Sequence, residues 1–241
     1  LYFATGGGVG HIYAIPAAGV GLPQLKPWFT SPETHLLSLA LDSAGNVYAG
    51  SSPNGIIYKI TPAGKAVVLY DAPDQNIAAL GIDSHGNIYA GTAPTAAIYK
   101  ITPDGTGKIL PTHATAGVLS IAVDKTDNVY ASSGNTIYRI APDETVQSFV
   151  APTDEQFLPV AIDPENGRVY TGTTTVASLY AIAESGGAAG RYVSTVHDAG
   201  LIARWGTISW TADTPPGAHV TLQTRSGNVE RPDSSWSDWS P

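Results

Sequence analysis

One feature of this chain restricts its fold more than any other: a motif recurs at intervals of about 41 residues through most of its length. The clearest copies occupy residues 40–50, 81–91 and 122–132, and a looser copy occupies residues 161–172. Each copy places an aspartate between an apolar run and a second run that contains a tyrosine. Repetition at this length is typical of folds that stack one small unit, because a single unit cannot bury a core of its own. The repeated aspartates are Asp42, Asp83, Asp124 and Asp163.

A second repeated column has the form Ile/Leu-Tyr-x-Ile and begins at Ile12, Ile57, Ile98, Ile137 and Leu179. Within one repeat we expect four short strands, separated by turns that Gly, Pro, Asn and Asp favour. The first strand is an apolar run, as expected of a strand that is buried on both faces. In the second repeat the four strands are predicted at residues 36–41, 47–50, 56–60 and 67–70.

Four antiparallel strands in about 40 residues form one blade of a β-propeller, whose blades stack their flat faces around an axis. The sequence therefore predicts an all-β fold, a β-propeller of four-stranded blades, about five of which are visible. The runs are too short and too β-rich for a helical solenoid, and the hairpin turns disfavour a parallel β-helix. The first blade lacks an innermost strand. Either a later segment supplies it and closes a five-bladed ring, or the repeats belong to a six- or seven-bladed ring.

The composition changes near residue 190, because four of the five tryptophans follow this point. We expect residues 1–190 to form the propeller repeats and residues 191–241 to form a partial β-sandwich, since a complete sandwich usually needs more residues. The chain contains no methionine and opens directly on a strand-like run. This predicts a processed chain or a fragment of a larger protein.

The motif Asp-x-x-Gly-Asn-Val/Ile-Tyr-Ala-Gly, followed by Ile-Tyr-Lys-Ile-x-Pro-x-Gly, resembles the repeats of NHL, streptogramin-lyase-like and gluconolactonase-like propellers. The resemblance covers roughly residues 1–190 and implies the fold, but those families include enzymes, sensors and scaffolds. The pattern differs from WD40 repeats, since no tryptophan lies between Trp28 and Trp205. The segment after residue 190 is similar to the start of the jelly-roll-type sandwich that follows propellers in large secreted bacterial proteins.

Charge and composition exclude several classes of partner. The formal net charge is −8 and the 12 Lys and Arg residues form no cluster, so nucleic acid and anionic membrane surfaces are disfavoured. No apolar run approaches the roughly 20 residues that cross a bilayer, so no membrane insertion is expected. The absence of Cys excludes thiol chemistry. Abundant Thr, Ser, Ala and Gly with little Lys favours an exported protein that is extracellular, at the cell surface or periplasmic.

No catalytic or metal-binding motif emerges from the sequence. Turn capping explains the repeated aspartates, because each lies in a separate repeat and they cannot converge on one ion. The six histidines show no metal-ligand spacing, and the glycine-rich residues 6–10 are expected to form a hairpin loop. The tyrosines of the third strands could form a carbohydrate-stacking ladder, but packing between blades explains their recurrence better. We therefore predict no metal, no cofactor and no catalytic residue.

One position differs from repeat to repeat, although most other positions of the repeat are similar. It lies seven residues before each aspartate, where the innermost strand begins, and contains His35, Asn76, Gly117 and Gln156. In a propeller this position lies at the mouth of the central channel, where ligands commonly dock. Streptogramin-lyase-like enzymes use a histidine near the channel as a base, but His35 has no evident partner for that role. The predicted rim residues are His35, Asn76, Gln156, Glu33, Asp74, Glu155 and Phe157.

These observations favour a non-enzymatic binding or assembly module of a larger exported protein. Its partner, a protein or a carbohydrate, is expected at the propeller rim or channel mouth, and further domains are expected in the same polypeptide. Two alternatives stay open. One is an enzyme at the channel mouth, such as a lyase or a lactonase, and the other is a structural subunit of a surface layer or filament.

Overall fold

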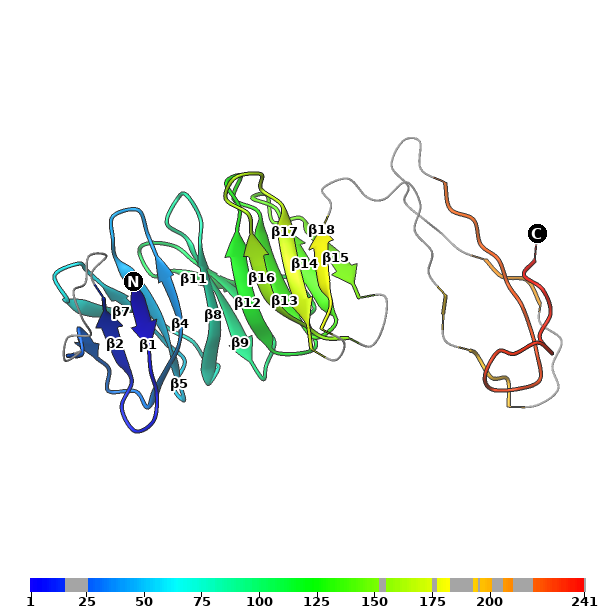
Figure 1. Cartoon of the computed structure of the whole chain (residues 1–241), viewed down its shortest axis with the longest axis horizontal. Helices are drawn as coiled ribbons and strands as arrows, with labels where there is room; N and C mark the ends of the chain where they lie inside the picture. The colour runs from blue at the N-terminus through cyan, green and yellow to red at the C-terminus, as the bar shows by residue number, and fades with distance from the viewer. Residues whose placement is uncertain are drawn as a thin grey trace. The chain divides into compact units, whose positions relative to one another are not determined.

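The computed structural model describes residues 1–15, 26–151, 155–174, 177–182, 193–194, 196–200, 206–209 and 219–240. The chain divides into two compact units, Leu1–Ser185 and Gly186–Pro241. All 18 strands of the described residues lie in the first unit, and no helix occurs among them (Figure 1). The described part accordingly contains no helix that could span a membrane.

The strands form five consecutive antiparallel sheets, which we number as blades 1 to 5. Blade 1 contains β1 (Tyr2–Ala4), β2 (His11–Ala14) and β3 (Phe29–Thr30). Blade 2 contains β4 (His35–Leu41), β5 (Val47–Ser52), β6 (Ile56–Ile60) and β7 (Ala66–Asp71). Blade 3 contains β8 (Asn76–Ile82), β9 (Ile88–Ala93), β10 (Ile98–Ile101) and β11 (Gly107–Ile109). Blade 4 contains β12 (Val118–Val123), β13 (Val129–Ser133), β14 (Thr136–Ile140) and β15 (Val146–Val150). Blade 5 contains β16 (Phe157–Ile162), β17 (Val169–Thr173) and β18 (Leu179–Ile182).

Blades 2, 3 and 4 each have four strands in chain order, as predicted, and the described residues of blades 1 and 5 form three. The register identifies the strand that blade 1 lacks. Phe3 of β1 pairs with Tyr13 of β2 in the same way that Ala49 of β5 pairs with Tyr58 of β6. Strand β1 is therefore the second strand of its blade, and the described residues of blade 1 contain no innermost strand, as predicted.

The first turn of each repeat is built around its aspartate. Asp42 Oδ1 accepts hydrogen bonds from the backbone N–H groups of Ala44 and Asn46, and Oδ2 accepts bonds from the side chains of Asn46 and Tyr48. Burial acts to raise the pKa of Asp42, but these bonds outweigh it and the pKa lies below its ordinary value. Burial and the charge of Asp42 raise the pKa of Tyr48 to about 12. Turn capping, the predicted role of these aspartates, is thus visible in the hydrogen bonds.

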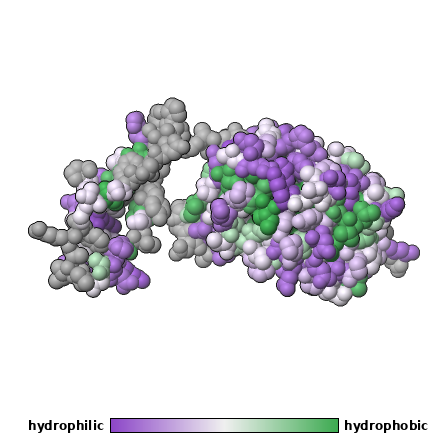
Figure 2. Space-filling model, turned by 180° about the vertical axis from the view of Figure 1, so that it is seen from behind, coloured by the Kyte–Doolittle hydropathy of each residue, from purple (hydrophilic) through white to green (hydrophobic). Residues whose placement is uncertain are grey.

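The blades are arranged as an open arc. The innermost strands β4, β8, β12 and β16 lie next to one another in that order, which gives the blades a common inner side. Blades 1 and 5 lie at opposite ends of the arc, as Figure 1 shows. The outermost strands expose Val67, Val68, Ile109 and Val150. On the face of this unit seen in Figure 2, apolar side chains gather in separate patches among polar ones.

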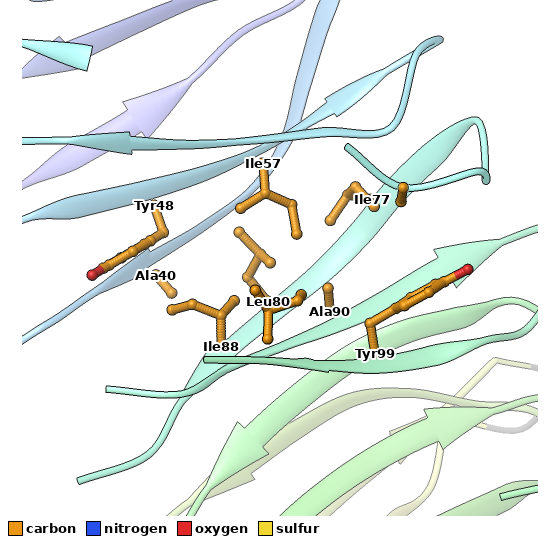
Figure 3. Packing of buried hydrophobic residues seen from close by; sticks show 10 residues of the cluster. Ala40, Tyr48, Ile57, Ile77, Leu80, Ile88, Ala90 and Tyr99 are labelled. Carbon is orange, nitrogen blue, oxygen red and sulfur yellow. The ribbon is translucent and has the colours of Figure 1, made fainter. Parts of the chain in front are cut away.

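Blades 2 to 4 each pack one face on the preceding blade, which we call the N-side face, and the other on the following blade, which we call the C-side face. The equivalent faces of blades 1 and 5 take the same names. Between blades 2 and 3, the C-side residues Ala40, Tyr48 and Ile57 meet Ile77 and the N-side residues of blade 3 (Figure 3). The N-side face of blade 3 consists of Ile88, Ala90, Tyr99 and Ile101, and that of blade 2 consists of Val47, Ala49, Tyr58 and Ile60. Burial of one large aliphatic or aromatic side chain contributes about 1.5–3 kcal/mol, so these interfaces hold the arc together.

In the second unit, residues 223–226 and 237–240 run side by side. Ser237 donates its backbone N–H to Ser226 O at 2.8 Å, and its hydroxyl accepts the N–H of Ser226 at 3.0 Å. The Arg225 guanidinium lies 5.6 Å from the ring centre of Trp236 and 4.7 Å from that of Trp239, at cation–π distance. No strand occurs among the described residues after Ile182, so the partial β-sandwich and its boundary stay predictions.

Candidate binding surface on the innermost strands

All four innermost strands contain a β-bulge at the same repeat position. In β4, Leu36 pairs with Ser51 and Ser38 pairs with Gly50, so that Leu37 between them has no partner on β5. The register of β8, β12 and β16 shifts at the equivalent place. A bulge re-aims the extra side chain away from the regular pleat. The residues in the bulges are Leu37, Ala78, Leu119 and, in β16, Leu158 with Pro159.

The bulges place apolar side chains in solvent. Leu37, Leu119 and Leu158 are 48%, 49% and 37% exposed, although Leu36 and Val118 beside them are buried. The expectation that the run 36–41 is buried on both faces is therefore wrong for Leu37 and also for Leu41, which is 47% exposed. For Leu37 the physical reason is the bulge, which re-aims the side chain away from the regular pleat, whereas Leu41 lies in the regular part of the strand.

Serine hydroxyls fix the bulges to the neighbouring blades. Ser38 of β4 donates to Ile77 O of β8 at 2.8 Å, just before the bulge of β8. Ser132 of β13 donates to the carbonyl of the bulged Leu158 at 2.7 Å. Ser120 of β12 accepts the N–H of Val160 at 3.0 Å. These contacts tie the main chain around the bulges of β8 and β16 to the neighbouring blade.

The predicted polar column lies at the start of the same strands. His35, Asn76 and Gly117 are half-buried, and Gln156 is exposed. The Asn76 amide is engaged within the protein, since it accepts a hydrogen bond from Ser52 at 2.6 Å and donates one to Ala93 O at 2.8 Å. The innermost strands β4, β8, β12 and β16 lie side by side, and we call the surface that they form the inner wall. Because these strands are equivalent, the residues of the column lie at one end of the inner wall.

The His35 ring packs against the glycine-rich loop of blade 1. This loop joins β1 to β2, as predicted, and follows the backbone of residues 33–36. A Cβ atom on Gly6 would lie 2.0 Å from His35 Nδ1, so only glycine leaves room for the imidazole. In the part of the chain that the structure describes, the His35 ring has no side-chain hydrogen-bond partner. Nothing in this arrangement orients His35 as a general base.

The acidic residues predicted for the rim are buried. Asp74 Oδ2 accepts a hydrogen bond from Tyr99 at 2.6 Å, and Glu155 Oε2 accepts one from Tyr180 at 3.4 Å. Glu33 Oε1 accepts one from the Asn54 amide at 3.2 Å. Phe157 is buried edge-on against Tyr180, with ring centres 5.8 Å apart. These four side chains stabilise the blades behind the wall, and contact with a ligand stays a prediction for them.

Two of the third-strand tyrosines pack between neighbouring blades. Tyr58 and Tyr99 are buried, as expected if packing between blades explains their recurrence. Burial and the bond to Asp74 raise the pKa of Tyr99 above its ordinary value. The faces of these two rings are consequently not available to stack on a carbohydrate.

A polar hollow of about 440 Å³ opens near the start of β8. It lies between the second hairpin of blade 2 and the connection to blade 3, and is lined by Pro53, Asn54, Ile56 and residues 71–75. Within the described ranges, no group of three or more His, Cys, Asp or Glu side chains is placed to hold a metal ion. The hollow therefore offers polar and apolar contacts to a ligand.

No model of a known protein family matches the sequence, and no curated protein matches it. Solved structures do. Virginiamycin B lyase from Staphylococcus aureus matches with a TM-score of 0.58 at 18% identity, over 71% of this chain and 62% of the lyase chain. A nidogen/laminin complex matches with a TM-score of 0.60 at 14% identity, over 71% of this chain and 69% of that chain.

A gluconolactonase-like protein matches with a TM-score of 0.53 at 13% identity, over 72% of this chain and 69% of that chain. The repeats of this chain are the blades of a β-propeller. The propeller spans 62% of the length of the lyase chain that it matches. At these identities the likeness shows the fold, and the propellers that share it include both enzymes and a protein found in a complex with another protein.

Proposed function

We propose that this propeller is a rigid, non-enzymatic binding module of a larger exported protein, and that it docks a protein partner at the mouth of its channel. The observation that carries the proposal is the column of bulged leucines. Leu37, Leu119 and Leu158 leave buried strands to stand exposed on the inner wall, and hydrogen bonds between blades fix the bulge in β16.

A protein partner fits this surface better than a carbohydrate. Protein interfaces combine a few apolar anchors with a polar rim, and the wall offers the leucines beside His35, Asn76 and Gln156. Sugar recognition usually uses exposed aromatic faces, whereas Tyr58, Tyr99 and Phe157 are buried. The net charge of −8 favours a neutral or basic partner and disfavours nucleic acid.

Peptide selection on the purified chain tests the proposal. We expect peptides selected on the wild-type protein to lose at least about fivefold in affinity for Leu119→Gln, because removing an apolar anchor from an interface costs more than about 1 kcal/mol. Val67→Gln is the matched control, since Val67 is 50% exposed on the outermost strand β7. Peptides that bind both variants equally well would show that the inner wall is not the binding surface.

The competing function is catalysis at the channel mouth. One matching structure is a catalytically inactive histidine variant of virginiamycin B lyase with quinupristin, and His35 is the histidine of this chain on the inner wall. Incubation of the protein with quinupristin and Mg²⁺, followed by liquid chromatography and tandem mass spectrometry, which also detect a product of unchanged mass, separates the two functions. We expect no change in the peptide. Conversion by the wild type that is lost in His35→Ala would replace the binding proposal with an enzyme.

A further inference from the structure

The two end faces of the arc are equivalent by register to faces that pack against a neighbouring blade elsewhere in it. In the N-side face of blade 1, Leu1, Phe3 and Tyr13 occupy the positions that Val47, Ala49 and Tyr58 occupy in blade 2. Leu1 is 81% exposed, whereas Val47 is fully buried. Phe3 and Tyr13 are half-buried and stack on each other with ring centres 4.9 Å apart.

The C-side face of blade 5 is uncovered in the same way. Ala161 pairs with Tyr170, and Gly172 pairs with Leu179, as Ala40 pairs with Tyr48 and Gly50 with Ile57 in blade 2. Ile57 is fully buried against blade 3, but its equivalent Leu179 is 74% exposed. Tyr48 is buried and its equivalent Tyr170 is half-buried.

A C-side face of this repeat is complementary to an N-side face of the same repeat. A C-side face built on tyrosine and a branched aliphatic side chain covers an N-side face at each interface within the arc. A second whole copy of the chain would bring the number of blades to ten, beyond the range of about four to eight that propellers use. The occupant must therefore carry the same faces but be shorter than this chain.

We propose that the end faces dock one or two further blades of this same repeat, carried by the same polypeptide, which bridge blade 5 to blade 1 and close the ring. The matching propellers support this number. The match covers 71% of the 241 residues of this chain and 62% of the lyase chain. The lyase chain is therefore about 275 residues long, which leaves room for about six to seven repeats of 41 residues. The inference concerns the ends of the arc and is independent of binding at the channel mouth.

Extended chains test the proposal, because blade 5 lies far along the sequence from an extension placed before Leu1. The shortest extension is a second copy of residues 73–87 fused before Leu1, and it supplies only the innermost strand of blade 1. A fused copy of residues 32–87 supplies this strand and one further blade, and a fused copy of residues 32–128 supplies the strand and two further blades. We expect at least one of the longer extensions to reduce hydroxyl-radical labelling of Leu179 at least about fivefold and to raise the midpoint of thermal unfolding by about 5 °C or more, relative to the strand-only extension.

Two substitutions separate docking from a general gain in stability. In the extended chain that responds, Leu179→Glu should abolish the rise in the unfolding midpoint, and Val67→Glu should not, since both residues are exposed in the unextended protein. Unchanged labelling of Leu179 in both longer chains would overturn the proposal. Concentration-dependent protection of Leu179 in the unextended chain, measured beside sedimentation, would also overturn it by identifying a second copy as the occupant.

Discussion

Tyr99 donates its hydroxyl proton to Asp74 Oδ2 at 2.6 Å, and both residues are buried. Asp74 lies two residues before β8, and Tyr99 lies in β10, so the bond ties the start of the innermost strand to the third strand of the same blade. Blade 5 repeats the contact between Glu155 and Tyr180. Two of the acids predicted to form the rim, Asp74 and Glu155, therefore tie the start of an innermost strand to the third strand of the same blade.

Substitution Tyr99→Phe should destabilise the protein by about 1–3 kcal/mol, because it leaves the Asp74 carboxylate buried without its donor. Urea unfolding measures the change. Tyr138→Phe is the matched control: Tyr138 occupies the same position in blade 4, where Thr115 and Ala116 replace the acid, and its hydroxyl has no hydrogen bond to the described residues. An equal loss of stability in both variants would contradict the role given to Asp74.

The turn aspartates predict how stability depends on pH. Burial acts to raise the pKa of Asp124, but hydrogen bonds from Asn128 and Thr126 hold it below its ordinary value of 3.8. A carboxyl whose pKa is lower in the folded state adds stability that is complete above 3.8 and is lost as the pH falls through the folded-state value. Asp124→Asn should therefore cost about 1–2 kcal/mol near pH 6 and less as the pH approaches about 2.5. A gap between wild type and variant that stays constant over this range would refute the argument.

The architecture could be predicted because it follows from local patterns that repeat. The strands expected at 36–41, 47–50, 56–60 and 67–70 correspond to β4, β5, β6 and β7, and the aspartate turns are where the motif places them. Each of these features depends on residues within about six positions of one another, so turn chemistry and strand propensity suffice to find them.

The surface could not be predicted as well, because it depends on contacts between distant residues. The sequence shows Leu37 as one more apolar residue in a strand, and only the pairing with β5 reveals that it is bulged and exposed. Asp74 looks like a polar residue in a loop until the fold brings Tyr99, 25 residues later, within hydrogen-bond distance. Polarity in a connection was therefore a poor guide to exposure.

Glycines on the C-side faces predict which blades have a neighbour. A Cβ atom on Gly91 of β9 would lie 2.5 Å from Val118 Cγ1 of blade 4, so Gly91→Ala should destabilise the protein by about 1–3 kcal/mol. Gly172 occupies the same position in blade 5, and its nearest contact would be Pro159 Cγ at 3.4 Å, an ordinary distance. Gly172→Ala should change the free energy of unfolding by less than about 0.5 kcal/mol. Thermal and urea unfolding of the pair decide the matter, and equal effects would show that the next blade is not what restricts Gly91.

Glu144 joins blades 3 and 4 through two lysines, and burial, not distance, should decide which pair is stronger. Lys108 Nζ lies 2.7 Å from Glu144 Oε2 and Lys100 Nζ lies 3.2 Å from Oε1, but the Lys108 side chain is 57% exposed and that of Lys100 is 17% exposed. Water screens the shorter contact more, so a double-mutant cycle of Lys100→Met with Glu144→Gln should give a coupling of about 0.5–1 kcal/mol. The cycle with Lys108→Met should give less, and only this smaller coupling should disappear in about 1 M NaCl. A larger coupling for Lys108 would mean that contact distance outweighs burial at this interface.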